Sequence, residues 1–199
     1  GSSPYKSPTD MGVNMAGFCI VDDEAVRAAA NEEILRRYHN LLCQKRQGTI
    51  GNEPIYKLEL LMSKAGIKPS DRPLVPAALE VAERTGNPAA SIALSDGTVI
   101  TGKTGSLLAS AAMLLNALKR LAGIPDEIDL ISPKVIEPIQ KLKVDHLGNH
   151  NPRLHTDEIL IALSICAAED DNARRAFDKL SELEGCDVHS TVILSSVDR

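Results

Sequence analysis

Residues 97–104 match the phosphate-loop pattern G-x-x-x-x-G-K-[ST], in which backbone N–H groups cradle phosphates and the lysine reaches the outer ones. The interior of the match is Thr98-Val-Ile-Thr101, four β-branched residues that favour a strand over a cradling loop. Asp96-Gly97 in front of them is typical of a two-residue hairpin turn. A nucleotide loop stays open as an alternative, although no clear aspartate ends an apolar strand downstream to hold Mg²⁺.

We therefore expect a hairpin corner at Asp96-Gly97 and, after it, a separate glycine-rich turn at the start of the next helix. The N-terminus of a helix attracts anions, and a lysine beside it adds charge. The alternative is a capped helix start without a ligand. The candidate anion-binding residues of this turn are Gly102, Lys103, Thr104, Gly105 and Ser106.

A second cluster of chemically active side chains lies between His146 and His155. Gly148 and Pro152 interrupt the helix that would place two histidines on one face, so we expect no metal site. An anion suits this loop better, because an arginine offers a bidentate fork and two histidines can donate beside a following helix N-terminus. The candidates are His150, Arg153 and His155, and solvated histidines in a turn are the alternative.

The segment 186–191 reads Cys-Asp-Val-His-Ser-Thr at the entrance of an expected strand. Two-residue alternation puts Asp187 and His189 on the same face, where they could orient each other as an acid–base pair. They are the weak catalytic candidates. The alternative is a polar sheet face, because no nucleophile is identified by spacing.

Composition excludes several classes of function. The formal net charge of -5 and the scarcity of aromatic residues, with no Trp, argue against nucleic acid as a partner. Unbroken apolar runs such as 111–115 are too short to cross a membrane. The four cysteines form no C-x-x-C pair and are expected to be reduced, so we predict a cytoplasmic protein without a metal or cofactor.

Hydrophobic periodicity and glycine or proline punctuation predict a helix-rich α/β fold. Residues 1–6 are interpreted as an expression remnant and linker, 7–88 as a helical subregion, and 89–199 as a three-layer α/β subregion with a small mixed sheet; the two are expected to form one compact unit. The expected elements are helices ending near Gly48, Gly66 and Gly86, a hairpin of 91–94 and 98–101, helices at 107–122, 133–147, 159–168 and 170–183, a short strand at 127–131 and a buried strand at 188–194.

Five segments carry a family resemblance: SPTDMGVNMAGF (7–18), TGK (101–103), LNALK (115–119), ISPKVIEP (131–138) and GCDVHS (185–190). With them the chain resembles the C-terminal part of a bacterial family known as domain of unknown function 1846, which lends no established activity. The resemblance implies a longer protein whose preceding N-terminal region carries its own phosphate-loop-like segment. The hairpin followed by a buried helix is also similar to the opening of cytidine-deaminase-like folds, but the zinc signature of those enzymes is missing.

Two functions follow as hypotheses. The first is an accessory and association module, because the apolar helices 107–122 and 159–168 need cover from the N-terminal domain of the same protein or from a second copy. The alternative is that the first three helices supply that cover. The second hypothesis is a ligand-binding or hydrolytic domain for a phosphorylated or anionic small molecule, in which the Lys103 turn and the His150–His155 loop converge.

Overall fold

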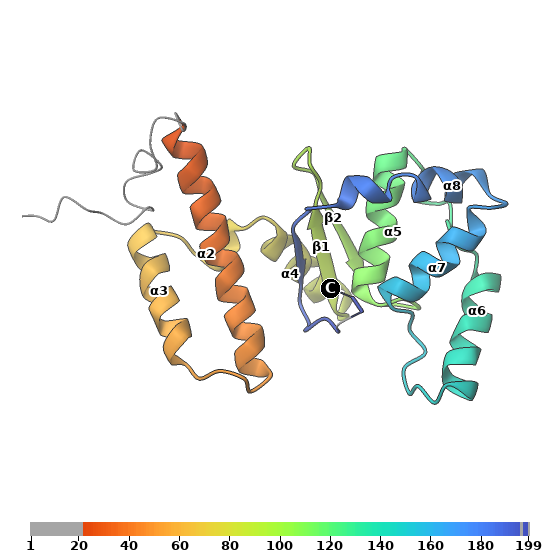
Figure 1. The fold of residues 1–199 in the computed structure, drawn as a ribbon, viewed down its shortest axis with the longest axis horizontal. Helices are drawn as coiled ribbons and strands as arrows, with labels where there is room; N and C mark the ends of the chain where they lie inside the picture. The colour runs from red at the N-terminus through yellow and green to blue at the C-terminus, as the bar shows by residue number, and fades with distance from the viewer. Residues whose placement is uncertain (1–21, 196, 199) are drawn as a thin grey trace, which may run out of the picture. The chain divides into compact units, whose positions relative to one another are not determined.

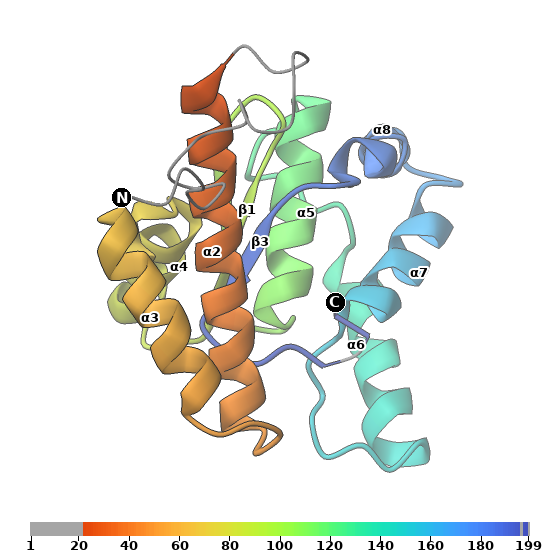
Figure 2. The same cartoon turned by 60° about the vertical axis from the view of Figure 1, so that its left-hand side comes forward.

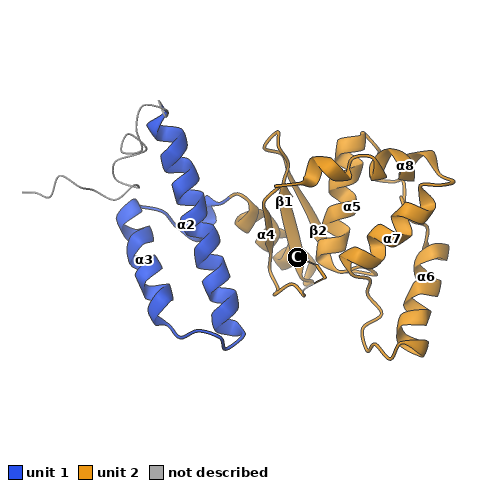
Figure 3. Ribbon diagram, viewed as in Figure 1, with its two compact units in different colours: residues 1–72 blue, residues 73–199 orange. Residues whose placement is uncertain are grey.

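The computed structural model of the chain describes residues 22–195, 197 and 198. It divides into two compact units, Gly1–Arg72 and Pro73–Arg199, shown in blue and orange in Figure 3. The sequence predicts one compact unit with an internal boundary at 88/89. The difference arises because the third predicted helix, α4 (Leu74–Thr85), packs on the sheet. The remnant and linker expected at 1–6 lie outside the described residues.

The first unit is a helical pair, α2 (Asp23–Arg46) and α3 (Glu53–Ala65), followed by a 3-10 turn, η2 (Pro69–Asp71). Asp22 caps α2 by accepting a hydrogen bond from the Ala25 N–H at 2.9 Å. The pair encloses a small core of Ile34, Leu35 and Met62. Gly66 ends α3 in the left-handed conformation, with φ of 69°, as glycine does at a helix C-terminus.

The second unit is built on a three-stranded antiparallel sheet in the order β2-β1-β3. Strands β1 (Ala89–Ala93) and β2 (Val99–Lys103) form the predicted hairpin, and β3 (Val188–Ser190) pairs with the other edge of β1. The sheet is therefore antiparallel and not mixed. Outside the sheet, an isolated parallel bridge joins Leu107 to Leu154.

The two faces of the sheet pack on different helices, α4 and α5, which Figure 1 shows beside the strands. Ala90, Ile92 and Leu94 pack against α5 (Ala109–Ala122). The intervening Ser91 points to the other face, where its hydroxyl donates to the carbonyl of Leu74 in α4 at 2.7 Å. Alternate side chains of β1 thus pack on α4 and on α5, so the sheet lies between these two helices. This arrangement gives the expected three layers.

A further helical layer covers the other side of α5. It comprises α6 (Pro133–Lys141), a π-helical turn η3 (Leu142–His146), α7 (Thr156–Cys166), α8 (Asp171–Phe177) and a 3-10 turn η4 (Leu180–Leu183). Leu118 of α5 and Ile159 and Leu163 of α7 are fully buried in the core between them. The cover that apolar α5 needs is therefore supplied by the C-terminal helices.

Two segments differ from their predicted elements. Residues 127–131 form no strand: the chain turns at 125–128, where the Ile128 N–H donates to the Pro125 carbonyl at 3.1 Å, and Leu130 and Ile131 then enter the helical core. Strand β3 ends at Ser190 because the Thr191 hydroxyl binds the backbone of Ala89 in place of a further strand residue. Figure 2 shows β3 beside β1, with α5 next to them.

Candidate functional site

The phosphate-loop match folds as the hairpin and its exit. Gly97 has φ of +83°, and residues 99–103 pair with β1 along their whole length. Gly102 lies against the backbone of α5, where an added Cβ would stand 2.1 Å from the Met113 nitrogen. The second glycine of the pattern therefore permits close packing of strand on helix, and the strand geometry excludes a phosphate cradle at 97–103.

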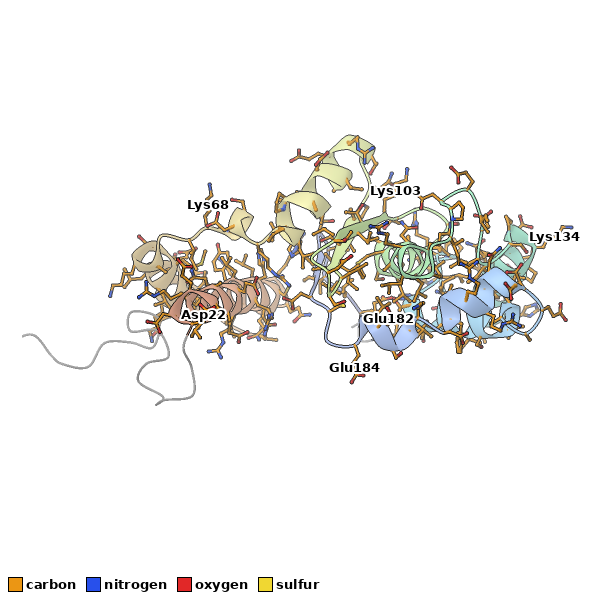
Figure 4. All side chains as sticks on the ribbon, turned by 90° about the horizontal axis from the view of Figure 1, so that it is seen from above. Asp22, Lys68, Lys103, Lys134, Glu182 and Glu184 are labelled. Carbon is orange, nitrogen blue, oxygen red and sulfur yellow. The ribbon has the colours of Figure 1, made fainter. Side chains whose placement is uncertain are left out.

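The turn that follows uses much of its own hydrogen-bonding capacity. The Thr104 N–H donates to Pro88 at 2.8 Å and the Gly105 N–H donates to Leu107 at 2.9 Å. The carbonyl of Ser106 accepts from Gln140 at 3.1 Å. Lys103 is exposed on the strand end (Figure 4). Thr104 is the exception, because it is only 8% exposed and its hydroxyl has no hydrogen-bond partner within the described residues.

The Lys103 turn and the histidine loop lie against each other. Leu108 donates its N–H to the Leu154 carbonyl at 3.0 Å, and the Arg153 Nε donates to the Gly105 carbonyl at 3.1 Å. The terminal nitrogens of the Arg153 guanidinium have no partner in the part of the chain that the structure describes. His150, three residues before Arg153, is exposed, and His155 is the N-cap residue of α7.

The side chain of Lys143 binds the backbone of the loop that carries Arg153 and His155. Its buried ammonium, 3% exposed, donates to the Arg153 carbonyl at 2.7 Å and to the Glu158 carboxylate at 2.8 Å. Glu158 in turn accepts from the His155 N–H at 2.8 Å, as the third residue of a capping box does. Arg153 and His155 are thereby fixed on either side of Leu154.

His155 is paired with Asp198. Nδ1 of the imidazole lies 2.8 Å from Oδ2 of the carboxylate, whose side chain is 3% exposed. The other oxygen accepts from the Ser110 hydroxyl at 3.1 Å and from both the N–H and the hydroxyl of Thr156 at 3.0 Å. Ser195 donates to Oδ2 at 2.6 Å. Asp198 therefore joins the first turn of α5 to the first turn of α7.

The electrostatics of Asp198 favour its ionised form. Burial by itself would raise the pKa of this carboxyl, but the hydrogen bonds donated by Ser195, Thr156 and His155 outweigh that effect and lower the pKa to about 2. A carboxylate that receives the Nδ1–H of a histidine fixes the tautomer of the ring and leaves Nε2 as the acceptor.

These groups line one cavity of about 300 Å³, at the lower end of the range for small-molecule sites. Its polar walls include Thr104, Ser110, Arg153, His155 and Asp198. Its apolar walls include Pro88, Leu108 and the segment 192–194. Leu108 is the N-cap of α5 and provides no side-chain cap, so the cavity reaches a helix N-terminus without such a cap.

The arrangement suits proton transfer at His155 and does not form a nucleophilic serine triad. Ser195 lies 3.5 Å from Nδ1, the nitrogen already engaged by Asp198, and its own proton is donated to that carboxylate. An activated serine would instead need the opposite ring nitrogen. The structure therefore presents an imidazole–carboxylate pair beside a cationic guanidinium.

Two family models match nearly the whole chain. Residues 1–66 match the model described as domain of unknown function DUF1846, N-terminal, and residues 70–199 match the C-terminal model of that family. The chain belongs to the DUF1846 family. The resemblance drawn from the five segments is confirmed, with one correction: the chain matches both domain models and not the C-terminal part alone.

Curated DUF1846 relatives are longer than this chain. It is 59% identical over 199 residues to a UPF0371 protein of Corynebacterium aurimucosum and 50% identical over 200 residues to one of Streptococcus pneumoniae strain P1031. In both cases all of the chain is matched, and it spans 40% of the relative. The names of these relatives carry no activity.

The weak catalytic candidates of the DUF1846 chain lie elsewhere. His189 is opposite Ser91 in the β1–β3 pairing, and the Asp187 carbonyl accepts from the Ala93 N–H at 3.0 Å just before β3. Neither lines the cavity with His155. Residues 22–195, 197 and 198 contain no group of three or more metal-ligating side chains, and none of the helices among them is long and apolar enough to cross a membrane.

Sequence reasoning missed Ser110, Ser195 and Asp198. Asp198 is 43 residues from its imidazole partner and belongs to no motif. The signal available was Thr156-Asp-Glu158 after His155, which marks a helix N-terminus but does not identify the carboxylate that binds there.

Proposed function

We propose that the α/β unit of this DUF1846 chain binds a small anionic molecule in the cavity at the first turns of α5 and α7, with His155 as its acid–base group. The observation that carries the proposal is the 2.8 Å pair of His155 and buried Asp198 in the wall of that cavity. Phosphorylated or carboxylate metabolites are the expected class of ligand.

The anionic end of the ligand is assigned to Arg153. Its guanidinium terminus is available for a bidentate contact with a carboxylate or phosphate. The N-terminus of α5 adds positive potential. Thr104 lines the cavity, and its hydroxyl, which has no partner among the described residues, offers a further hydrogen bond.

The reactive end of the ligand is assigned to His155. Asp198 is ionised and bound by four further donating groups, so its carboxylate holds the imidazole in one orientation. A ligand bridging Arg153 and His155 would place its anionic group away from Asp198. That separation is needed because two like charges in one small cavity repel.

Isothermal titration calorimetry with inorganic phosphate, glycerol 3-phosphate and malonate tests the proposal. We expect saturable heat from at least one of the three, and roughly tenfold weaker binding in Arg153→Gln, because a charge-assisted hydrogen bond contributes about that factor. Arg84→Gln, an exposed position on α4, is the matched control. No heat from any of them, or equal affinity in both variants, would contradict the proposal.

An association function is the second candidate, favoured by the outer face of α7. Ile161 and Ile165 are 62% and 65% exposed there, one helical turn apart. We propose that this face contacts the remainder of a longer chain, because the relatives extend well beyond the matched 40% of their length. A phosphate-loop-like region is expected in that remainder.

Size-exclusion chromatography of this chain mixed with the separately produced remainder of the Corynebacterium aurimucosum relative tests the association. Co-elution that Ile161→Glu/Ile165→Glu abolishes and Lys134→Glu preserves is the expected result. Separate elution, or co-elution that the double variant leaves intact, would refute it. A dimer of the chain alone that the double variant dissolves would assign the face to a second copy.

A further inference from the structure

A second cleft, of about 810 Å³, lies away from the His155 cavity, alongside edge strand β2. Its walls come from residues 99–101 of β2, from the C-terminal half of α5 and from the loop 123–126. Ile100, Ile124 and Pro125 give the cleft apolar surface. The cleft shares no lining residue with the His155 cavity.

A buried ammonium lines this cleft. Lys119 is only 8% exposed, and its Nζ donates to a single acceptor, the carbonyl of Asp126, at 3.0 Å. Within residues 22–195, 197 and 198 it has no ion-pair partner. An ammonium has three donors, and a buried charge without a counter-charge is costly. Lys119 therefore has the capacity and the electrostatic need for an anionic partner.

Capping of its own helix does not explain this lysine. Basic residues in a last turn often bind the terminal carbonyls. In α5 the carbonyls of Lys119 and Arg120 accept from the N–H groups of Ile124 and Gly123, at 2.9 and 3.3 Å, and the Ala122 carbonyl accepts from Arg175 at 2.6 Å. Lys119 instead extends into the cleft wall.

Among the described residues, Lys119 is the lining cation that lacks a facing carboxylate, because Arg120 interacts with Asp96. Arg120 lines the same cleft and faces Asp96 at the hairpin corner; the hydrogen bond from the Thr98 N–H, with a smaller contribution from Arg120, lowers the pKa of Asp96. Asp126 is the one acidic residue among the lining residues, and it forms no ion pair with Lys119 in the described chain. Two cations and one carboxylate therefore border the cleft.

The edge of β2 favours a small molecule over an added peptide strand. At the two ends of the β1–β2 ladder, the Leu94 N–H donates to the Thr98 carbonyl and the Thr104 N–H donates to the Pro88 carbonyl. Because bonding alternates along a strand, the even-numbered residues of β2 face β1. The backbone N–H and C=O groups of Val99, Thr101 and Lys103 therefore point to the free edge. Asn116 already donates to the Thr101 carbonyl at 2.8 Å. A strand would have to displace that amide, whereas a ligand in the cleft would not.

We infer that the cleft between β2 and the end of α5 is a second ligand site, taking a small molecule with an anionic group on an apolar body. The anionic group binds Lys119 and Arg120, and the apolar body lies on Ile100, Ile124 and Pro125. The inference does not depend on the function proposed for the His155 cavity.

Nuclear magnetic resonance of the ¹⁵N-labelled chain with phenyl phosphate tests the site, with phenol as the uncharged analogue. We expect saturable shifts of the amides at 99–101, 119–124 and 126 with phenyl phosphate and none with phenol. Lys119→Met should weaken binding roughly tenfold, Lys119→Arg should retain it, and Lys134→Met, an exposed control, should not change it. Arg153→Gln should leave these shifts intact.

Three results would overturn the inference. They are the absence of shifts at these amides with millimolar phenyl phosphate, equal shifts with phenol, and unchanged affinity in folded Lys119→Met. The comparison of phenyl phosphate with phenol uses the unaltered chain, so it decides the matter even where a variant does not fold. Binding of an acidic peptide along β2 without a response to phenyl phosphate would also refute the small-molecule site.

Discussion

The Asp198 carboxylate lies 2.8 Å from Nδ1 of His155, where the first turns of α5 and α7 meet. One oxygen binds the hydroxyl of Ser110 and the backbone of Thr156, and the other binds the imidazole. Asp198 thus links α5 to α7 and its N-cap residue His155, two helices that are far apart in sequence. It both stabilises the fold and defines the electrostatics of the cavity.

Asp198→Asn should change how stability depends on pH. The pKa of Asp198 falls from 3.8 to about 2 on folding, so the carboxylate stabilises the fold above about pH 4 and loses that contribution as the pH drops toward 2. We expect a pH-dependent difference of about 2 kcal/mol in the free energy of unfolding. Urea unfolding from pH 2 to 7 measures it, with Asp178→Asn as the exposed control. Parallel pH profiles for the unaltered chain and Asp198→Asn would show that the carboxylate is not specially stabilised.

Gly102→Ala should destabilise the α/β unit by about 3 kcal/mol, because the new methyl group meets the backbone of α5 and not a flexible side chain. Gly105→Ala is the matched control, since its Cβ has no atom within 4 Å. Chemical denaturation of both variants separates a packing role from a ligand role. A mild Gly102→Ala effect equal to that of Gly105→Ala would mean that the strand and helix can move apart.

Lys143→Met should loosen the loop that carries Arg153 and His155. It removes a buried bond to the Arg153 carbonyl and leaves Glu158 without its cation, for an expected loss of about 2 kcal/mol. Lys141→Met, one helical position away from η3 and exposed, should be nearly neutral. Thermal unfolding compares the two, and amide exchange at 153–156 reports the loop itself. Unchanged exchange there would argue against a positioning role for Lys143.

Much of the fold follows from local patterns. Glycines after Ala65 and Thr85 end helices in the left-handed conformation, and Asp96-Gly97 forms the hairpin corner. These features depend on neighbouring residues. The subregion boundary predicted at 88/89 does not coincide with the division at 72/73, because the packing of α4 on β1 and β2 is a long-range contact that its helical periodicity does not encode.

The candidate site shows the same division. Arg153 and His155 were identified from residue type and from the following helix start, and the structure brings them to one cavity with Thr104. The phosphate-loop letters at 97–103 proved to be strand pairing and close packing by Gly102. Asp198 could not be predicted, because its role depends on the tertiary meeting of α5 and α7.

The most direct test of the ligand site is a chemical-shift map of the ¹⁵N-labelled chain titrated with glycerol 3-phosphate. We predict saturable shifts of the amides at 104–110 and 153–156, lost in Arg153→Gln and retained in Arg84→Gln. Shifts confined to other parts of the chain, or shifts at these amides that survive Arg153→Gln unchanged, would contradict the account.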